Sequence, residues 1–209
     1  MFAILLCLQW AFAGGDVFPA PDVTPPPSVS FEEVPAPASV RPKDIKGAPH
    51  QVHARLLSDH NAVRAGQTFR IGVHLQQDEG WHTYWKSPGS VGQPTDITWK
   101  APSGTEISEY QYPIPSYFVQ SNIVSIGYEE QVLLISDITL PEDAPTGVVT
   151  ISADVRWLVC KQSCIPGKAT LSLPINVTTD RQASPYVELF DYYESLHPTN
   201  PLDIKAFTV

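Results

Sequence analysis

Residues 155–167 read VRWLVCKQSCIPG and carry two cysteines, Cys160 and Cys164, separated by three residues. Apolar residues recur at alternate positions on both sides of this stretch, which is the pattern of half-buried strands. On one continuous strand the two Cα atoms would lie about 13 Å apart, whereas a disulfide requires Cα atoms within about 7 Å. A bond between them therefore requires the chain to reverse. Pro166 and the alternating flanks favour a hairpin with a bulged loop over a helical turn.

The same alternation extends through residues 51–179. Three runs place apolar residues on one face: Phe69, Ile71, Val73 and Leu75; Val149, Ile151, Ala153, Val155 and Trp157; and Leu171, Leu173, Ile175 and Val177. Turn signals rich in glycine and proline separate such runs, and no convincing helix lies between them. Short strands at this spacing predict an all-β fold, an immunoglobulin-like antiparallel β-sandwich, with a small barrel as the alternative.

The segments on either side differ in composition. Residues 14–50 contain nine prolines and few large apolar residues, which predicts an extended, disordered linker. Residues 180–209 are predicted to form a short C-terminal helix and tail, with the helix starting near Ser184 and ending before Pro198. Its apolar stripe comprises Tyr186, Leu189, Phe190, Tyr193 and Leu196. We expect this helix to dock on the sandwich rather than to bind a partner.

Residues 1–13 form an apolar run that ends in Ala11-Phe12-Ala13, the small-x-small pattern that a signal peptidase accepts. We interpret the run as a signal peptide. Its removal would also remove Cys7 and leave the pair near the C-terminus in an oxidising compartment, where paired thiols form disulfides. Lipid attachment at Cys7 is the alternative, although the preceding Leu6 is larger than such sites prefer.

The charge of the chain limits its partners. The sequence has 22 acidic and 13 basic residues, a formal net charge of −9, and no cluster of lysines or arginines. This balance argues against nucleic acid or an anionic membrane surface, both of which attract basic patches. Another protein is the expected partner.

The spacing of the cysteines also bears on whether their bond is a staple or a reactive group. Closing a loop of about five residues stabilises a fold by only about 2 kcal/mol, less than a longer loop would give. Strand alternation places Trp157 and Val159 on the core face and Cys160 on the other, which predicts a reachable sulfur. Lys161 beside it would favour a thiolate. Spacing alone leaves the structural and the redox interpretation open.

Residues 157–167, with the pattern WLVCxxxCIPG, resemble the cysteine motif of the N-terminal periplasmic domain of DsbD-type thiol:disulfide interchange proteins, and most closely the ScsB-like branch. Residues 80–89 (GWHTYWKSPG), 92–99 and 126–129 (IGYE) support the likeness in the same order. Together these stretches cover most of residues 51–177.

The resemblance implies an immunoglobulin-like domain that exchanges electrons by thiol–disulfide chemistry, as a component of a protein-disulfide reductase, without a cofactor or a metal. It implies that Cys164 forms the mixed disulfide and that Cys160 resolves it. It further implies an aromatic cap over the sulfurs, for which residues 112–122 with Tyr117 and Phe118 are the candidates, and Tyr84 is a further shielding residue.

The partners implied are a thioredoxin-like protein or domain, a membrane electron-transfer module, and oxidised periplasmic proteins of a Gram-negative bacterium. No membrane module or thioredoxin-like Cys-x-x-Cys motif follows residue 177, so we expect the membrane module to be encoded elsewhere.

Two other functions remain open on the residues. The cysteines with His82 or His74 could hold copper or zinc, although nothing in the sequence fixes a third ligand. The domain could also be a non-catalytic interaction module with an inert disulfide, in which case the bond should resist reduction.

Overall fold

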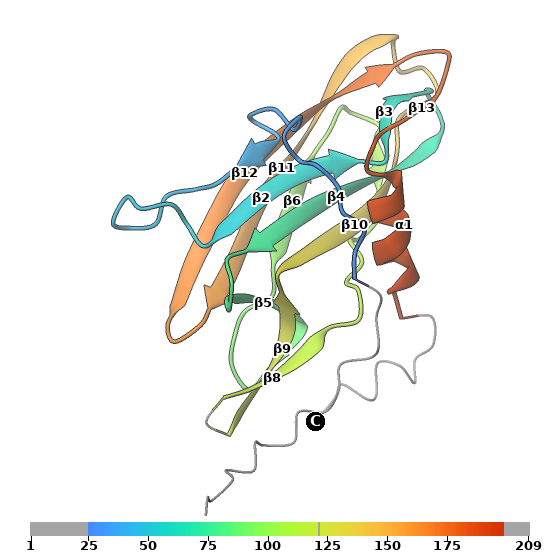
Figure 1. The fold of residues 1–209 in the computed structure, drawn as a ribbon. Coiled ribbons are helices and arrows are strands. Elements are labelled where there is room, and N and C mark those ends of the chain that lie inside the picture. Colours follow the sequence, from blue (N-terminus) through green and yellow to red (C-terminus); the bar gives the residue numbers. More distant parts are fainter. Residues whose placement is uncertain (1–24, 121, 199–209) are drawn as a thin grey trace, which may run out of the picture.

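The computed structural model describes residues 25–198 apart from residue 121, and it shows two packed β-sheets with one short helix at their side (Figure 1). One sheet has the strand order β1(Ser39–Val40), β2(Val52–Ser58), β4(Thr68–Gln77), β10(Gln131–Thr139), β7(Glu106–Ile107). The other has the order β13(Gln182–Ala183), β3(His60–Val63), β12(Cys164–Val177), β11(Gly147–Cys160), β5(His82–Gly89), β9(Ile123–Glu129), β8(Ser116–Gln120), with β6(Asp96–Lys100) also paired to β11. The predicted β-sandwich is confirmed. Its pairing is antiparallel except between β12 and β3, which run parallel.

The core lies between the two sheets and follows the alternation seen in the sequence. Phe69, Ile71, Val73 and Leu75 of β4 are each at most 2% exposed. They meet the inward side chains of β11 and β12, including Ile151. Burial of these side chains at alternate positions fixes the register of the strands, since a slip by one residue would turn the apolar face outward.

The longest hairpin joins β11 to β12, two strands of 14 residues each. Its register runs from Gly147 opposite Val177 to Cys160 opposite Cys164. Gly167 lies opposite Trp157, and a Cβ atom there would come within 2.3 Å of the Trp157 indole. Glycine at this position therefore lets the indole lie across the neighbouring strand, so that the hairpin stays regular up to its tip.

The described part of the expected linker, residues 25–50, differs from a free tether. Its strand β1 pairs with β2, and Ala38 next to it is fully buried. Phe31 stacks on His74 with ring centroids 4.6 Å apart, and the guanidinium of Arg55 lies 4.5 Å from the centre of the Phe31 ring. A few apolar residues thus hold a proline-rich segment against the sheet, which composition alone did not reveal. Residues 14–24 of that segment and the expected signal peptide lie outside the described residues.

Helix α1(Val187–Ser195) lies against the first sheet, as predicted. Leu189, Phe190 and Tyr193 are buried and belong to a second apolar cluster that also contains Leu57 of β2 and Leu133 of β10. Arg70 of β4 binds Asp59 and also reaches Asp191 and Glu194 on the helix. This ion-pair group fixes the helix to the sheet beside its apolar contact. Among the described residues, no helix has the length and hydrophobicity needed to cross a bilayer.

Candidate functional site

The tip of the long hairpin carries a disulfide between Cys160 and Cys164, with Cα atoms 4.1 Å apart and sulfur atoms 2.06 Å apart. The two cysteines are register partners at the ends of β11 and β12, and residues 161–163 make the turn. Within the turn, the backbone N–H of Lys161 donates to the carbonyl oxygen of Ser163 at 3.2 Å. The predicted reversal of the chain between the cysteines is therefore confirmed.

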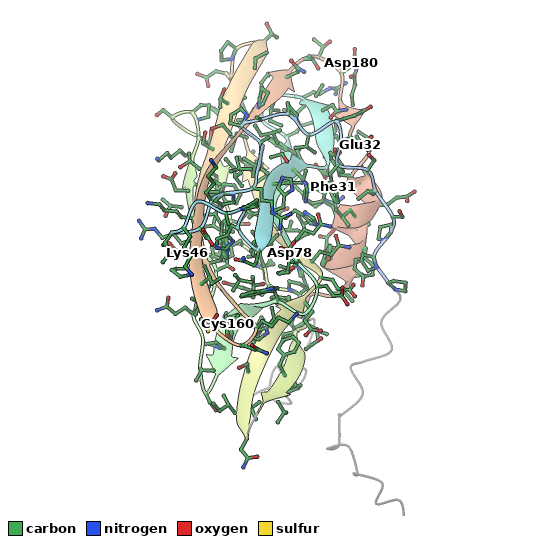
Figure 2. The ribbon with its side chains drawn as sticks, turned by 60° about the vertical axis from the view of Figure 1, so that its left-hand side comes forward. Phe31, Glu32, Lys46, Asp78, Cys160 and Asp180 are labelled. Atoms are coloured by element: carbon green, nitrogen blue, oxygen red, sulfur yellow. A yellow bond between two sulfur atoms is a disulfide. The ribbon has the colours of Figure 1, made fainter. Side chains whose placement is uncertain are left out.

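The two cysteines differ in exposure. Cys160 is only 3% exposed, whereas Cys164 is an exposed residue. The prediction that Cys160 is reachable from solvent is thus wrong. Cys160 is not a member of the main core cluster, and residues of β5, β8 and β9 line the cavity beside it. Figure 2 shows Cys160 near the end of the sandwich where these strands lie.

A small cavity of about 130 Å³ lies beside the disulfide. Its lining comprises His82, Tyr84, Val91, Phe118, Ile123, Ser125 and residues 160–164. The structure therefore brings Tyr84 and Phe118 to the disulfide, but Tyr117 does not line this cavity. Successive side chains of a strand point to opposite faces, so Phe118 of β8 points inward while its neighbour Tyr117 is 36% exposed.

The cap over the disulfide is a β-hairpin rather than the loop expected for residues 112–122. Strand β8 pairs with β9, and β9 pairs with β5, which places the cap at the edge of the second sheet. A Cβ at Gly127 of β9 would lie 1.9 Å from the carbonyl oxygen of Thr83, so only glycine allows this close approach to β5. The hydroxyl of Tyr128 donates to the carbonyl oxygen of Pro113 at 2.7 Å. These contacts fix the position of Phe118 above the cavity.

His82 is the residue of this site that the redox interpretation of the sequence missed. It is the register partner of Cys160 on β11 and of Glu129 on β9. Its ring stacks on Phe118 at a centroid distance of 4.8 Å and meets the edge of Tyr84 at 5.2 Å. Burial lowers the pKa of His82, because the charged imidazolium loses hydration there. Its position in the Trp-rich motif was a signal, but its alignment with Cys160 depends on a cross-strand register that the sequence does not give.

Three further ionisable side chains lie near the disulfide, those of Lys161, Tyr84 and Glu129. The ammonium group of Lys161 donates to the carbonyl oxygen of Glu79 at 3.2 Å. Burial raises the pKa of Tyr84, and a hydrogen bond with Ser125 partly opposes that shift. Partial desolvation of its carboxyl group and the neighbouring Glu130 raise the pKa of Glu129, although the residue as a whole is exposed. The cavity thus has a mixed lining, in which His82 and Tyr84 are the two ionisable aromatic residues beside the disulfide.

The two histidines considered as metal ligands lie in different sheets. His74 of β4 is fully buried and hydrogen-bonds through Nε2 to Gln131 at 2.9 Å. His82 of β5 lies beside the disulfide. Across residues 25–198, apart from residue 121, no group of three or more His, Cys, Asp or Glu side chains is arranged to hold a metal ion.

The chain is thus an immunoglobulin-like sandwich with a disulfide at the tip of its longest hairpin, between one buried and one exposed cysteine. Residues 53–176 match the family described as "Thiol:disulfide interchange protein DsbD, N-terminal". The chain belongs to this family, as the cysteine motif predicted.

A solved structure shares the fold. The chain is similar to the N-terminal periplasmic domain of ScsB from Proteus mirabilis, with 22% sequence identity, a TM-score of 0.53, and coverage of 71% of this chain and 55% of that one. It thus spans about half the length of that structure. A weaker likeness is to the sporulation control protein Spo0M from Bacillus subtilis, with 13% identity, a TM-score of 0.31, and coverage of 66% and 52%. No curated protein matches the chain.

Proposed function

We propose that this domain relays electrons between a thioredoxin-like protein and oxidised protein substrates through the Cys160–Cys164 pair. The observation that carries the proposal is the unequal exposure of the two sulfur-bearing residues. Cys164 is exposed at the hairpin tip, whereas Cys160 is 3% exposed beneath the cap. An incoming thiolate needs access to one sulfur only, and Cys164 is the exposed residue of the pair.

The exchange follows from this asymmetry. In the reducing direction, a thiolate of the thioredoxin-like partner attacks the sulfur of Cys164, a mixed disulfide forms, and Cys160 leaves as a thiolate. The second thiolate of the partner then attacks the partner sulfur that is bonded to Cys164. This releases Cys164 as a thiolate, so the partner is oxidised and the Cys160–Cys164 pair has gained two electrons. In the following reaction Cys164 attacks a substrate disulfide, and Cys160 resolves the mixed disulfide as the reduced substrate leaves.

The family and the likeness to a periplasmic domain support a periplasmic location in a Gram-negative bacterium. A disulfide formed by the only two cysteines among the described residues fits that oxidising compartment. The source of electrons in this proposal is a membrane module that acts through the thioredoxin-like partner. The substrates are periplasmic proteins with accessible disulfides, and the formal net charge of −9 argues against nucleic acid.

A trapping assay with two cysteine variants tests the proposal. Cys160→Ala leaves Cys164 without its resolving partner, so we expect it to accumulate a mixed disulfide with a thioredoxin-like protein. Cys164→Ala leaves only the covered cysteine, so we expect little or no trapped product. The products are read on non-reducing gels and by mass spectrometry, with Ser163→Ala in the same turn as the control that should behave as wild type.

The outcomes separate the alternatives. Failure of both cysteine variants to trap any partner, together with a wild-type disulfide that a reduced thioredoxin-like protein leaves intact, would remove the redox function. Trapping by Cys164→Ala alone would reverse the two roles and would contradict the argument from exposure.

A further inference from the structure

The disulfide belongs to a row of residues that crosses four strands. Cys164 of β12 is paired with Cys160 of β11, which is paired with His82 of β5, which is paired with Glu129 of β9. Residues directly opposite on neighbouring antiparallel strands have side chains on the same face, with Cβ atoms about 4.5–5.5 Å apart. The imidazole of His82 therefore lies next to the covered cysteine, and both line the cavity beside the disulfide.

The surroundings of His82 hold its ring in place. Phe118 stacks on it with planes only 19° apart, and the Tyr84 ring meets it edge-on at 78°. These contacts come from β8 and from β5 itself, so the imidazole is fixed from two sides. The ring is thereby kept in the cavity that Cys160 also lines, which is where a base for the Cys160 thiol would have to lie.

The covered cysteine needs such a group. A free cysteine has a pKa of about 8.5, so only about 3% of it is thiolate at pH 7. Exposed Cys164 can lose its proton to water or buffer, but Cys160 is 3% exposed beneath the aromatic cap. Burial lowers the pKa of the His82 imidazole and so favours its neutral form, in which one ring nitrogen can accept a proton.

We propose that His82 transfers the proton of Cys160 during exchange, an inference that rests on the proposed redox function. When Cys164 is joined to a substrate, the Cys160 thiol gives its proton to the imidazole, and the Cys160 sulfur attacks the sulfur of Cys164. The Cys160–Cys164 bond forms, the bond from Cys164 to the substrate breaks, and the substrate leaves as a thiolate. The imidazolium then returns its proton to that thiolate or to water. In the reverse direction the departing Cys160 thiolate takes its proton from the imidazole, which water reprotonates.

Other ionisable groups face His82 from the neighbouring elements. Glu129 faces it from β9, the hydroxyl group of Tyr84 lies on the same strand, and Lys161 lies in the turn. The ammonium group of Lys161 is bound to the carbonyl oxygen of Glu79, and the raised pKa of Tyr84 makes its phenol a poor base near neutral pH. Glu129 is exposed, and as a carboxylate across from His82 it would stabilise the imidazolium formed in the step.

The test uses the chromogenic disulfide dithiobis(nitrobenzoate) and the fully reduced protein in a stopped-flow instrument. Attack by Cys164 releases one nitrothiolate in a phase that depends on reagent concentration. Attack by Cys160 on the mixed disulfide releases the second in a concentration-independent phase, which isolates the step assigned to His82. His82→Phe keeps an aromatic ring for Phe118 and Tyr84 but removes the base.

We expect the concentration-independent phase of His82→Phe to be about 10- to 30-fold slower than wild type at pH 7, since a base can recover at most the roughly 30-fold deficit in thiolate. The two rates should converge above about pH 9, where Cys160 ionises without help. His82→Gln should behave in the same way and replaces the phenylalanine variant if that one does not fold. His53→Gln removes an imidazole from β2, outside the cavity, and should keep the wild-type profile.

Equal rates of wild type and His82→Phe at pH 7 would overturn the inference. A uniform slowing at every pH would also overturn it, because that result indicates a structural role for the ring. A wild-type protein without any concentration-independent phase would instead contradict the proposed function, so the two failures are distinguishable.

Discussion

Substitution of Gly167 by alanine tests how the hairpin that carries the disulfide is built. A Cβ at this position would lie 2.3 Å from both Cε2 and Nε1 of Trp157 and 2.6 Å from its Cζ2. Trp157 is only 4% exposed, so the indole has little room to move. Overpacking of this kind costs about 1–3 kcal/mol. For a chain of this size, that corresponds to a melting temperature lower by roughly 3–9 °C.

Thermal unfolding of the oxidised protein, followed by circular dichroism, measures this effect in a double-mutant cycle. Trp157→Leu removes the indole and is itself destabilising by about 3 kcal/mol, since it leaves a cavity in the core. Gly167→Ala should then cost little in the Trp157→Leu background, which gives a coupling of about 1 kcal/mol or more. The exposed neighbour Lys168 is the control, because its alanine variant should stay within about 0.5 kcal/mol of wild type. A Gly167→Ala protein that melts like wild type, or a penalty that persists without the indole, would refute the reasoning.

Three further predictions concern the cap, the buried histidine and the helix. Phe118→Ala should speed reduction of the disulfide by dithiothreitol several-fold, because it opens the cavity that lies beside both cysteines. Tyr117→Ala should have a smaller effect, and equal rates of the two variants in an alkylation gel assay would contradict the cap geometry. Burial lowers the pKa of His74 from 6.5 to about 3. Between these two pH values only the unfolded chain binds a proton at His74, so the free energy of unfolding should fall by up to about 1.4 kcal/mol per pH unit as the pH drops. Urea unfolding at pH 7 and pH 4.5 should show that His74→Asn loses less free energy of unfolding between these two pH values than the wild type. An identical loss would count against the role of His74 in the pH dependence. Arg70→Met should lower the free energy of unfolding by about 2 kcal/mol. This is less than the roughly 3–5 kcal/mol lost when one partner of a fully buried ion pair is removed, because the helix partners of Arg70 are exposed. Hydrogen exchange of α1 should also accelerate, and unchanged exchange would show that apolar contacts alone hold the helix.

The sequence predicted those features that depend on local patterns. The hairpin at Cys160–Cys164 followed from alternation on both sides and from the distance that a disulfide allows. The prediction of helix α1 rested on a change in the period of the apolar residues and on a proline near its start. The predicted apolar stripe is the face that packs on the sheet. These predictions need only neighbouring residues along the chain, so one sequence was enough.

The features that were missed depend on contacts between distant segments. Cys160 is buried by strands more than 30 residues before it, and alternation along β11 does not report what covers the outer face. The pairing of His82 with Cys160 is a register between strands far apart in sequence, for which no local pattern exists. Phe31 and Ala38 gave no periodic signal, yet they hold a proline-rich segment against the sheet. Strand parity within β8 would have separated Tyr117 from Phe118, had residues 116–120 been recognised as a strand.

The long ladder between β11 and β12 has a consequence for the lifetime of intermediates. It holds the backbones of the two cysteines side by side by pairing that does not involve their sulfur atoms, so the thiols remain neighbours after reduction. Each thiol then meets the other at an effective concentration far above that of any free protein in solution. In the exchange that we propose, re-closure is therefore a unimolecular step, which favours release of a partner joined to the tip over a second encounter.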